Sequence, residues 1–412
     1  MDTFVEHCAG LDVHKDIVVA TVRTPGKGRR RHTETATFGT TARQVALLGD
    51  WLAGHDVTLV GMEATGVYWK PVFYGLEDRF VCWLLNAHHL RNVPGRKTDV
   101  ADSAWICQLV EHGLVRPSFV PPPPIRRLRN LTRARKAQIQ ERGRTVQRLD
   151  KILQDAGVKI NSVASKTLSV SSRLMLEALV AGQRDPAVVA DLAKGRMRAK
   201  IPTLREALDG RFDDHHATVV RQLLAHVDAL DVGIAAFDAR VAQAAAPWAD
   251  LVELLCTIPG VKTRTAQVLI AECGADMSVF PTAGHLASWA GVCPGNRESA
   301  GKHYSGKTRP GSKWLRTALT EAAQAATRTS DTYLASHFRH LRGRRGKHKA
   351  IGALRHDILI AFWHIASKRE PYHDLGGDWH QRRYSPDKQA QRLVRQLERL
   401  GHKVTLQPPD TA

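Results

Sequence analysis

The sequence of 412 residues predicts an α/β domain followed by a mostly helical, all-α region. Three observations predict this fold class. Residues 7–112 alternate β-rich runs with amphipathic segments, which is typical of a sheet covered by helices. Four consecutive prolines at 121–124 end this pattern, because proline continues neither a helix nor a central strand. Beyond them, apolar residues recur at helical spacing.

The first domain, residues 1–116, is expected to have the element order β-β-β-α-β-α-β-α. Runs rich in Val, Ile and Thr between polar turns indicate strands, and apolar residues three or four apart indicate helices. This order predicts a mixed sheet with helices on its faces. The expected strands are 7–13, 17–23, 32–38, 57–64 and 81–85, and the expected helices are 41–55, 66–78 and one that starts at Asp99.

Residues 125–246 are expected to form a basic helical region with coiled-coil character. Its first helix, 125–156, has ten Lys or Arg and two acids between 126 and 151. This pattern suits a solvated helix with a packing seam, or equally an arm for pairing or phosphate contact. An aliphatic stripe in 203–245 indicates core or a coiled-coil seam. Residues 157–202 are left without an assignment.

Residues 247–375 are expected to form a C-terminal domain that contains a helix-hairpin-helix. "LVELLCTIPGVKTRTAQVLIAECG" predicts a helix, a tight turn and a second helix from Thr263, whose first amides can bind a DNA phosphate. Lys262 stands where a second glycine is usual and is expected to contact phosphate. A loop at 291–313 and a helix at 314–328 follow. The tail, 376–412, is polar and charged, with one short helix at 387–401.

The charge balance predicts a polyanionic partner. There are 60 Lys+Arg and 40 Asp+Glu, so the net charge is +20. This excess indicates nucleic acid first and an anionic membrane surface second. No apolar run is long enough to span a membrane, and the first residues do not resemble a signal peptide. The six cysteines are scattered, which argues against zinc and disulfides and fits reduced thiols in a cytosol.

Asp99 and Asp102 stand three residues apart where the last helix of the first domain begins. Asp99 could be the N-cap, with Asp102 favoured by the helix dipole. Alternatively, positions i and i+3 share a helix face and can offer two carboxylates to a hard cation. For this pair alone, capping is the commoner explanation.

Two further acids favour the metal interpretation. Asp12 lies in the first strand and Glu63 ends the fourth, and an acid in such an apolar strand is costly unless something neutralises it. The element order places these strands side by side at the sheet centre, with the Asp99–Asp102 helix across their ends. Four converging carboxylates would repel one another unless cations lay among them. Two Mg²⁺ ions would satisfy all four acids and suit phosphoryl transfer, with Mn²⁺ as a substitute.

These motifs resemble a known family. Asp12, Glu63 and "TDVADS" resemble the DEDD signature of a RuvC-like, ribonuclease H-type domain. "TIPGVKTRTAQVLIAECG", "ASWAGVCPGNRESAGK" and "WLRTAL" resemble the C-terminal domain of the DEDD insertion-sequence transposases of the "IS one-ten" type, to which the Piv invertase is related. The resemblance covers most of residues 7–112 and 250–325. It implies a DNA recombinase in the bacterial cytoplasm, associated with the nucleoid.

The resemblance also implies a serine nucleophile after the "GxxP" loop. The matching residue is Ser299, with Ser305 as the reserve candidate because Ser-Ala-Gly stands here in place of Ser-Gly. A serine hydroxyl is weakly nucleophilic without a base or a metal. The resemblance implies that the carboxylate-bound metals activate it and that the two domains meet in the assembled complex.

Several cations are candidates for nucleic-acid contact, although each could equally be a solvated surface residue. They are Arg126, Arg127, Arg133, Lys262, Arg297, Lys302, Lys307, Arg309, Lys313, Arg344 and Arg345. The expected partners are donor DNA and target DNA. The resemblance adds a structured non-coding guide RNA, the bridge RNA, and recombination of two duplexes suggests a dimer to tetramer.

Two other functions fit parts of the same pattern. A metal-dependent nuclease, such as a junction resolvase, would use the four carboxylates without a serine. A non-catalytic nucleic-acid-binding protein with a degenerate nuclease fold would need neither metal nor serine, and the intact set of four acids counts against it.

Overall fold

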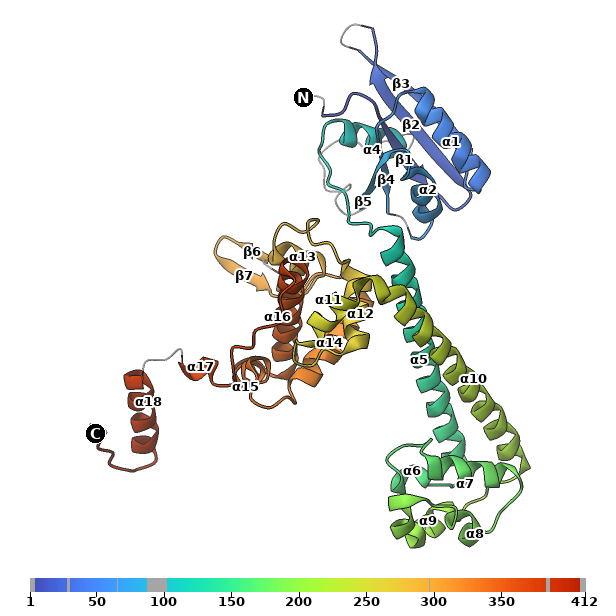
Figure 1. Cartoon of the computed structure of the whole chain (residues 1–412), viewed down its shortest axis with the longest axis vertical. Coiled ribbons are helices and arrows are strands. Elements are labelled where there is room, and N and C mark those ends of the chain that lie inside the picture. Colours follow the sequence, from blue (N-terminus) through green and yellow to red (C-terminus); the bar gives the residue numbers. More distant parts are fainter. Residues whose placement is uncertain are drawn as a thin grey trace. The chain divides into compact units, whose positions relative to one another are not determined.

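The computed structural model describes residues 4–27, 30–64, 66–86, 102–295, 297–382 and 386–407. The chain forms two compact units, Met1–Val120 and Pro121–Ala412, which divide at the proline run (Figure 1). Within the described residues, no helix has the length and apolar character needed to cross a membrane. The division of the second unit into residues 125–246, 247–375 and 376–412 stays a prediction.

The first unit is built on a five-stranded mixed sheet, as predicted. The strand order is β3-β2-β1-β4-β5. β1 pairs antiparallel with β2, and β2 with β3, whereas β1–β4 and β4–β5 are parallel. The strands are β1 (Cys8–Val13), β2 (Ile17–Pro25), β3 (Arg31–Gly39), β4 (Leu59–Glu63) and β5 (Val81–Leu85).

Helices cover both faces of this sheet (Figure 1). The hydroxyl of Thr41 caps α1 (Ala42–Gly54) by accepting a hydrogen bond from the amide of Gln44. α1 and α2 (Trp69–Leu76) pack on the face of β1 that carries Leu11. α4 (Asp102–Glu111) packs on the opposite face, where Cys8 contributes to a second apolar cluster.

The second unit begins with a two-helix arm. α5 (Pro123–Asp155) starts inside the proline run, because the first turn of a helix needs no amide hydrogen from proline. α10 (Asp214–Ala245) packs along α5. The helical stretch expected over 203–245 is interrupted, because Asp213 forms a capping box with His216 and starts a new helix there.

A small helical module joins the two arm helices. It holds residues that the sequence left unassigned, and apolar side chains from each of its helices form one core with the ends of α5 and α10. Its elements are α6 (Ile160–Val163), α7 (Val170–Val180), α8 (Pro186–Ala190), the 3₁₀ helix η1 (Gly195–Lys200) and α9 (Ile201–Leu208).

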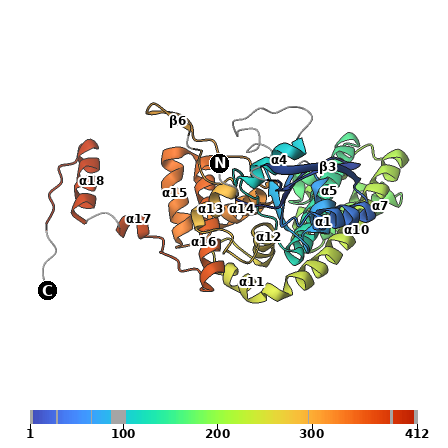
Figure 2. The same ribbon diagram turned by 90° about the horizontal axis from the view of Figure 1, so that it is seen from above.

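The C-terminal part of the second unit is helical, with one two-stranded hairpin. The sequence did not predict the longest helix of this part, α16, whose buried residues include Phe362. α15 and α16 lie side by side (Figure 2). The elements are η2 (Ala246–Trp248), α11 (Ala249–Cys256), α12 (Thr263–Cys273), α13 (Ala283–Trp289), β6 (Arg297–Ser299), β7 (Lys302–Ser305), α14 (Lys313–Ala326), α15 (Tyr333–Arg345), α16 (Lys347–Lys368), α17 (Trp379–Arg382) and α18 (Pro386–Arg399).

Candidate active site and nucleic-acid interface

Asp12 and Glu63 occupy equivalent positions on neighbouring parallel strands at the sheet centre. β1 and β4 pair in register up to Leu11 opposite Met62, and the next residue on each strand is the acid. Side chains alternate between the two faces of a strand, so residues in matching register point to the same face. The fold therefore brings these two carboxylates together on one face, as the element order predicted.

That face is the one covered by α4. Gly10 and Gly61 precede the two acids by two positions and therefore share their face. A Cβ atom at Gly10 would lie 2.2 Å from the backbone oxygen of Ser103 and 2.3 Å from the backbone nitrogen of Cys107. A Cβ atom at Gly61 would lie 2.5 Å from Cγ2 of Val110. Only glycine at these positions lets α4 approach the sheet this closely.

The direction of α4 brings Asp102 to the end of the sheet where Asp12 lies. Asp102 is the first described residue of the helix, and Ser103 lies over Gly10. The last residue of the helix binds Arg23, which pairs with the first residue of β1. The helix thus runs opposite to β1, and its acidic N-terminus points toward the carboxyl end of the strand.

Both ends of α4 are attached to the sheet. At its start, the hydroxyl of Ser103 lies 2.8 Å from that of Thr21, which lies 2.9 Å from that of Thr35. At its end, the carboxylate of Glu111 is 1% exposed and lies 2.7 Å from Nε of Arg23. These contacts hold the helix in one position on the sheet, which also fixes the backbone of Asp102.

The donor chemistry of this face suits a divalent metal. Asp12, Glu63 and Asp102 are all half-buried, and carboxylate oxygens are the ligands that Mg²⁺ prefers. One oxygen of Asp12, Oδ2, lies 3.0 Å from Nε2 of His14. The fourth predicted ligand, Asp99, lies outside the described residues. Within the part of the chain that is described, no three His, Cys, Asp or Glu side chains are grouped as closely as metal ligands.

The predicted nucleophile, Ser299, lies in a hairpin rather than in the irregular loop expected from the sequence. It pairs with Lys302 across a two-residue turn. The turn residues Ala300 and Gly301 have φ of 50° and 74°, the left-handed conformation that tight hairpins require. Ser305 pairs with Arg297 at the other end of the hairpin. The two candidate serines are therefore separated along its length.

The loop that carries this hairpin is closed at its base. A Cβ atom at Gly291 would lie 2.6 Å from the backbone oxygen of Arg309, and one at Gly311 would lie 2.1 Å from that of Ala290. The two chain segments thus meet backbone to backbone at a pair of glycines. The next residue, Ser312, caps α14 by accepting a hydrogen bond from the amide of Leu315. The hairpin projects from a fixed base.

α11, the "IPG" turn and α12 follow one another where the helix-hairpin-helix was predicted. Gly260 in the turn has φ of 86°, and a Cβ atom there would lie 2.3 Å from the backbone oxygen of Ala322 in α14. The turn glycine is therefore packed against protein. Lys262 is exposed and precedes α12 without capping it by its side chain. The lysine of this turn is exposed, and its contact with a phosphate stays a prediction.

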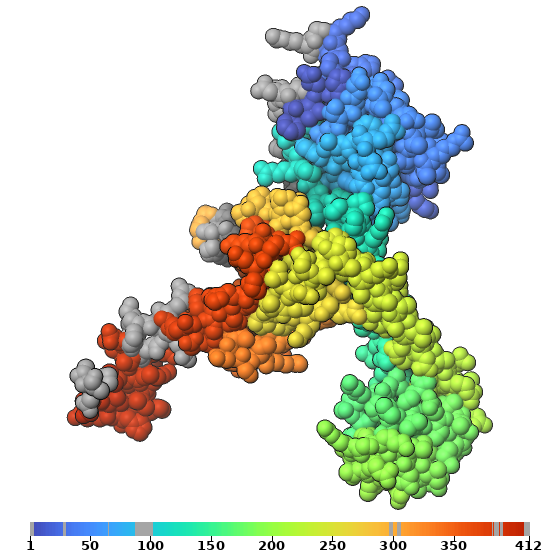
Figure 3. Space-filling model, in the orientation of Figure 1, coloured from blue at the N-terminus to red at the C-terminus, as the bar shows by residue number. Residues whose placement is uncertain are grey.

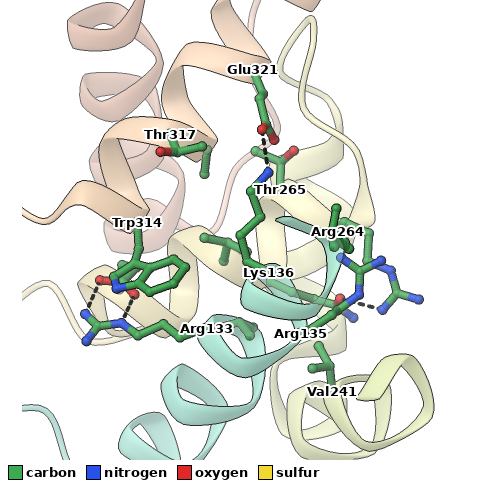
Figure 4. Close-up of a pocket in the computed structure, with 15 residues that line it drawn as sticks. Arg133, Arg135, Lys136, Val241, Arg264, Thr265, Trp314, Thr317 and Glu321 are labelled. Atoms are coloured by element: carbon green, nitrogen blue, oxygen red, sulfur yellow. Dashed lines mark hydrogen bonds and ion pairs between the residues drawn. The ribbon is translucent and has the colours of Figure 1, made fainter. Parts of the chain in front are cut away.

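Arg133, predicted to contact nucleic acid, is an internal ion-pair partner in this structure. Its Nε and terminal nitrogen lie 2.7 and 2.8 Å from the two carboxylate oxygens of Glu272, which is 1% exposed. Ser312 donates a hydrogen bond to the same carboxylate. The guanidinium borders a cavity of about 160 Å³ beside Trp314 (Figure 4). This ion pair fastens α5 to α12 and α14.

Removing the buried acid of this ion pair is expected to destabilise the second unit. Glu272→Gln leaves Arg133 half-buried without its charge partner, at a cost of about 3–5 kcal/mol. Glu321→Gln is the matched control, because that carboxylate is 57% exposed and its ion pair with Lys136 contributes about 0–1 kcal/mol. The measurement is the urea midpoint followed by tryptophan fluorescence. Equal midpoints for the two variants would contradict the assignment.

Most of the other cations predicted to contact nucleic acid are exposed, and Arg126 is half-buried. Their exposure is compatible with phosphate contact, which stays a prediction. The side chain of Arg297 lies outside the described residues. The exposed cations are Arg127, Lys302, Lys307, Arg309, Lys313, Arg344 and Arg345.

The sequence interpretation missed the residues that position α4. The signal was present, since "GLD" at 10–12 and "GME" at 61–63 share a glycine two residues before the acid. In a pair of parallel strands, this spacing places a glycine without a side chain beside each carboxylate on the same face of the sheet. A helix can approach the sheet closely at such a position. Thr21 and Ser103 carry no comparable signal, because their contact joins residues far apart in the chain.

Comparisons with known proteins match both units. A transposase model of the DEDD IS110 group matches residues 9–157, and the model described as "Transposase IS116/IS110/IS902 family" matches residues 252–339. Together they cover more than half of the chain. A relative in Streptomyces coelicolor, named "Insertion element IS110 uncharacterized 43.6 kDa protein", is 42% identical over 74 residues. That match spans 18% of this chain and 18% of the relative.

Proposed function

The chain belongs to the IS110 family of DEDD transposases, and we propose that it cuts and rejoins DNA strands to move an insertion sequence. The observation that carries the proposal is the shared face of Asp12 and Glu63 beside the acidic start of α4. An acid on the helix-covered face of an apolar strand costs free energy unless it is paired or hydrogen-bonded, and acids that lie together at one end of a sheet can share a cation. The convergence of such acids supports a catalytic metal site.

Four carboxylates of this chain would hold the metal. Transposases of this family are generally dependent on divalent metal ions, and hard oxygen donors favour Mg²⁺, with Mn²⁺ as a substitute. The proposed ligands are Asp12, Glu63, Asp99 and Asp102. When bound, two such ions supply charge stabilisation at the scissile phosphate. The fixed start of α4 keeps Asp102 in place, and His14 orients Asp12 by binding one of its two oxygens.

Ser299 is the proposed nucleophile. Its hydroxyl oxygen attacks the scissile phosphorus, its proton passes to solvent or a nearby base, and one phosphorus–oxygen bond of the strand breaks. The departing strand end takes up a proton and keeps its hydroxyl. A hydroxyl of another strand then attacks the phosphoserine, which forms a new phosphodiester and restores the serine. The position of Ser299 beside the hairpin turn, on a loop with a fixed base, supports this role.

The nucleic-acid partners in this proposal are donor and target DNA, with a structured guide RNA that pairs with both. The exposed cations near the hairpin, Lys302, Lys307 and Arg309, and those at the end of α15, Arg344 and Arg345, would contact phosphates. The proposal of a guide RNA rests on the family resemblance alone. Joining two duplexes calls for at least two copies of the chain. A tetramer would supply one active site for each of the four strands.

The two serine candidates can be separated by one experiment. Cells that carry the whole native element are assayed for its excision with wild-type protein, Ser299→Ala or Ser305→Ala. Excision is expected to fall on the order of 10³-fold for Ser299→Ala, since the nucleophile is lost. It is expected to stay within about threefold of wild type for Ser305→Ala. The reverse pattern would assign Ser305, and activity in both variants would favour a hydrolytic nuclease.

A further inference from the structure

The module that joins α5 and α10, here called the tip module (residues 156–213), is larger than a turn needs. Two antiparallel helices are usually joined by a few residues. The tip module instead has four α-helices and a 3₁₀ helix, which form an apolar core with the ends of α5 and α10. It forms a rounded body at the end of the arm, coloured green in Figure 3. A folded domain at this position suggests a binding function.

Its most distinctive surface is a row of cations on and beside η1. Lys194, Arg196, Arg198 and Lys200 alternate with small or apolar residues in "KGRMRAK", and all four are exposed. Met197 packs against the module core between the two arginines. The backbone at Lys194 is also fixed, because its amide donates a hydrogen bond of 2.9 Å to the hydroxyl of Ser171. The charges are therefore presented outward from a fixed backbone.

These cations differ in their partners from three arginines of the same module, Arg173, Arg184 and Arg205, which bind acids. Arg173 forms ion pairs with Glu177 and Asp228, and Arg205 pairs with Asp191. Within residues 156–213, all of which are described, the side chains of Lys194, Arg196 and Arg198 meet no acid. Lys200 donates to the backbone oxygen of Val163. Unpaired cations gathered on one segment repel one another, so their grouping favours an anionic ligand.

The geometry fits the backbone of duplex DNA. A 3₁₀ helix has three residues per turn and rises about 2 Å per residue, so Arg196 and Arg198 leave η1 on either side of Met197 and about 4 Å apart along its axis, close to the spacing of about 3.4 Å between phosphates of one strand along the DNA axis. Phe212 is the module's one aromatic residue, and it is buried. Single-strand sites normally use exposed aromatic platforms for stacking, and this surface has none. Contact with a duplex backbone therefore fits better than contact with splayed bases.

The position along the arm also fits a duplex. Asp238 binds both Arg135 of α5 and Arg264 of α12, which places the start of α12 beside residue 135. From there α5 continues for 20 residues to Asp155, about 30 Å. One turn of B-DNA is about 34 Å, so contacts at Lys262 and at the tip would fall nearly one turn apart.

From these observations we propose that the tip module binds the phosphate backbone of duplex DNA through Lys194, Arg196 and Arg198. The inference rests on the proposed function, because it assumes that the protein acts on DNA. It adds a second, sequence-independent contact at the far end of the arm, which would hold a duplex along α5. The arm would then act as a spacer between two DNA contacts.

Salt-dependent binding to a labelled duplex tests the inference. Full-length protein is titrated into a fluorescein-labelled duplex of about 40 base pairs, and affinity is measured by anisotropy over a range of salt concentrations. The test variant is Lys194→Gln/Arg196→Gln/Arg198→Gln. The control, Lys159→Gln/Arg205→Gln/Arg221→Gln, removes the same charge from exposed cations that already have partners in the structure. A single reversal, Arg198→Glu, serves as a second variant, and circular dichroism checks folding.

The test variant is expected to bind at least about tenfold more weakly at 0.1 M salt, and its log–log salt slope should fall by about 2–3, since each lost phosphate contact lowers it by about 0.9. The control and wild type should have equal slopes. Equal slopes for the test variant and the control would overturn the inference alone. A loss confined to a hairpin RNA probe would reassign the surface to RNA and also overturn it. A wild-type protein that binds no duplex, either alone or with RNA transcribed from the whole native element, would overturn the proposed function as well.

Discussion

Replacing Asp12 with Asn is expected to abolish strand cleavage while leaving the protein folded. The substitution keeps the shape of the side chain and removes the negative charge that a divalent cation needs. Because Asp12 lies opposite Glu63 on the face covered by α4, no other described side chain of β1 can replace it. Element excision is expected to fall on the order of 10³-fold, as when a charge-stabilising group is removed from an active site.

Asp16→Asn is the matched control for this prediction. Asp16 is exposed in the turn between β1 and β2, so the same change of charge occurs four residues away and outside the proposed site. Excision by Asp16→Asn should stay within about twofold of wild type, and both variants should bind duplex DNA, since binding depends mainly on cations. Full activity of Asp12→Asn would show that the acids on this face are structural.

Filling the space at Gly10 is expected to displace α4 and with it Asp102. In Gly10→Val the new Cβ atom would meet backbone atoms of Ser103 and Cys107 at 2.2 and 2.3 Å, and a helix backbone cannot move aside by a side-chain rotation. Overpacking of this kind costs about 1–3 kcal/mol or more. Excision should fall at least about a hundredfold, because the carboxylates no longer converge.

Gly143→Ala separates this effect from a general cost of replacing glycine. Gly143 lies in α5, where an added Cβ atom has nothing within 4 Å. Alanine there should raise the stability by about 0.5–1 kcal/mol through helix propensity, with excision unchanged. The urea midpoint and the excision assay together check both variants. A Gly10→Val protein as stable and active as wild type would contradict the close approach of α4.

The described part of the first unit could be predicted almost completely from the sequence. Its strands alternate clearly, and their order with the helices predicts that β1 and β4 are neighbours, so the pairing of Asp12 with Glu63 followed from topology. The position of Asp102 was predicted only as lying across the strand ends. The direction of α4, which brings Asp102 to the strand ends, depends on the close approach at Gly10 and on the contact of Ser103 with Thr21. Both contacts join residues that are far apart in the sequence.

The second unit was less predictable, because tertiary contacts stabilise several of its elements and the local sequence of those elements gives no clear pattern. The segment 291–313 is rich in Gly, Lys and Ser, and reads as a loop, but Ala300 and Gly301 form the turn of a hairpin. α16 mixes apolar and basic residues with little periodicity, and its packing against α14 and α15 stabilises it. The tip module consists of short helices, none of which gives a clear pattern alone.

Arg133 shows why charge alone did not identify the nucleic-acid contacts. In the sequence it is one of many cations on a basic helix, with nothing to separate it from Arg127. In the structure Arg133 binds a buried carboxylate, whereas Arg127 is exposed. The acid that pairs with Arg133 is 139 residues further along the chain, so no local pattern could reveal it.

The most direct test of the account is covalent trapping of DNA on the protein. Cells that carry the whole native element express wild-type protein, Ser299→Ala or Asp102→Ala, and denatured protein is examined for attached DNA. The wild-type protein is expected to form an adduct that maps to Ser299, and both variants are expected to form none. Strand cleavage without any adduct, unchanged by Ser299→Ala, would contradict it and leave a hydrolytic nuclease.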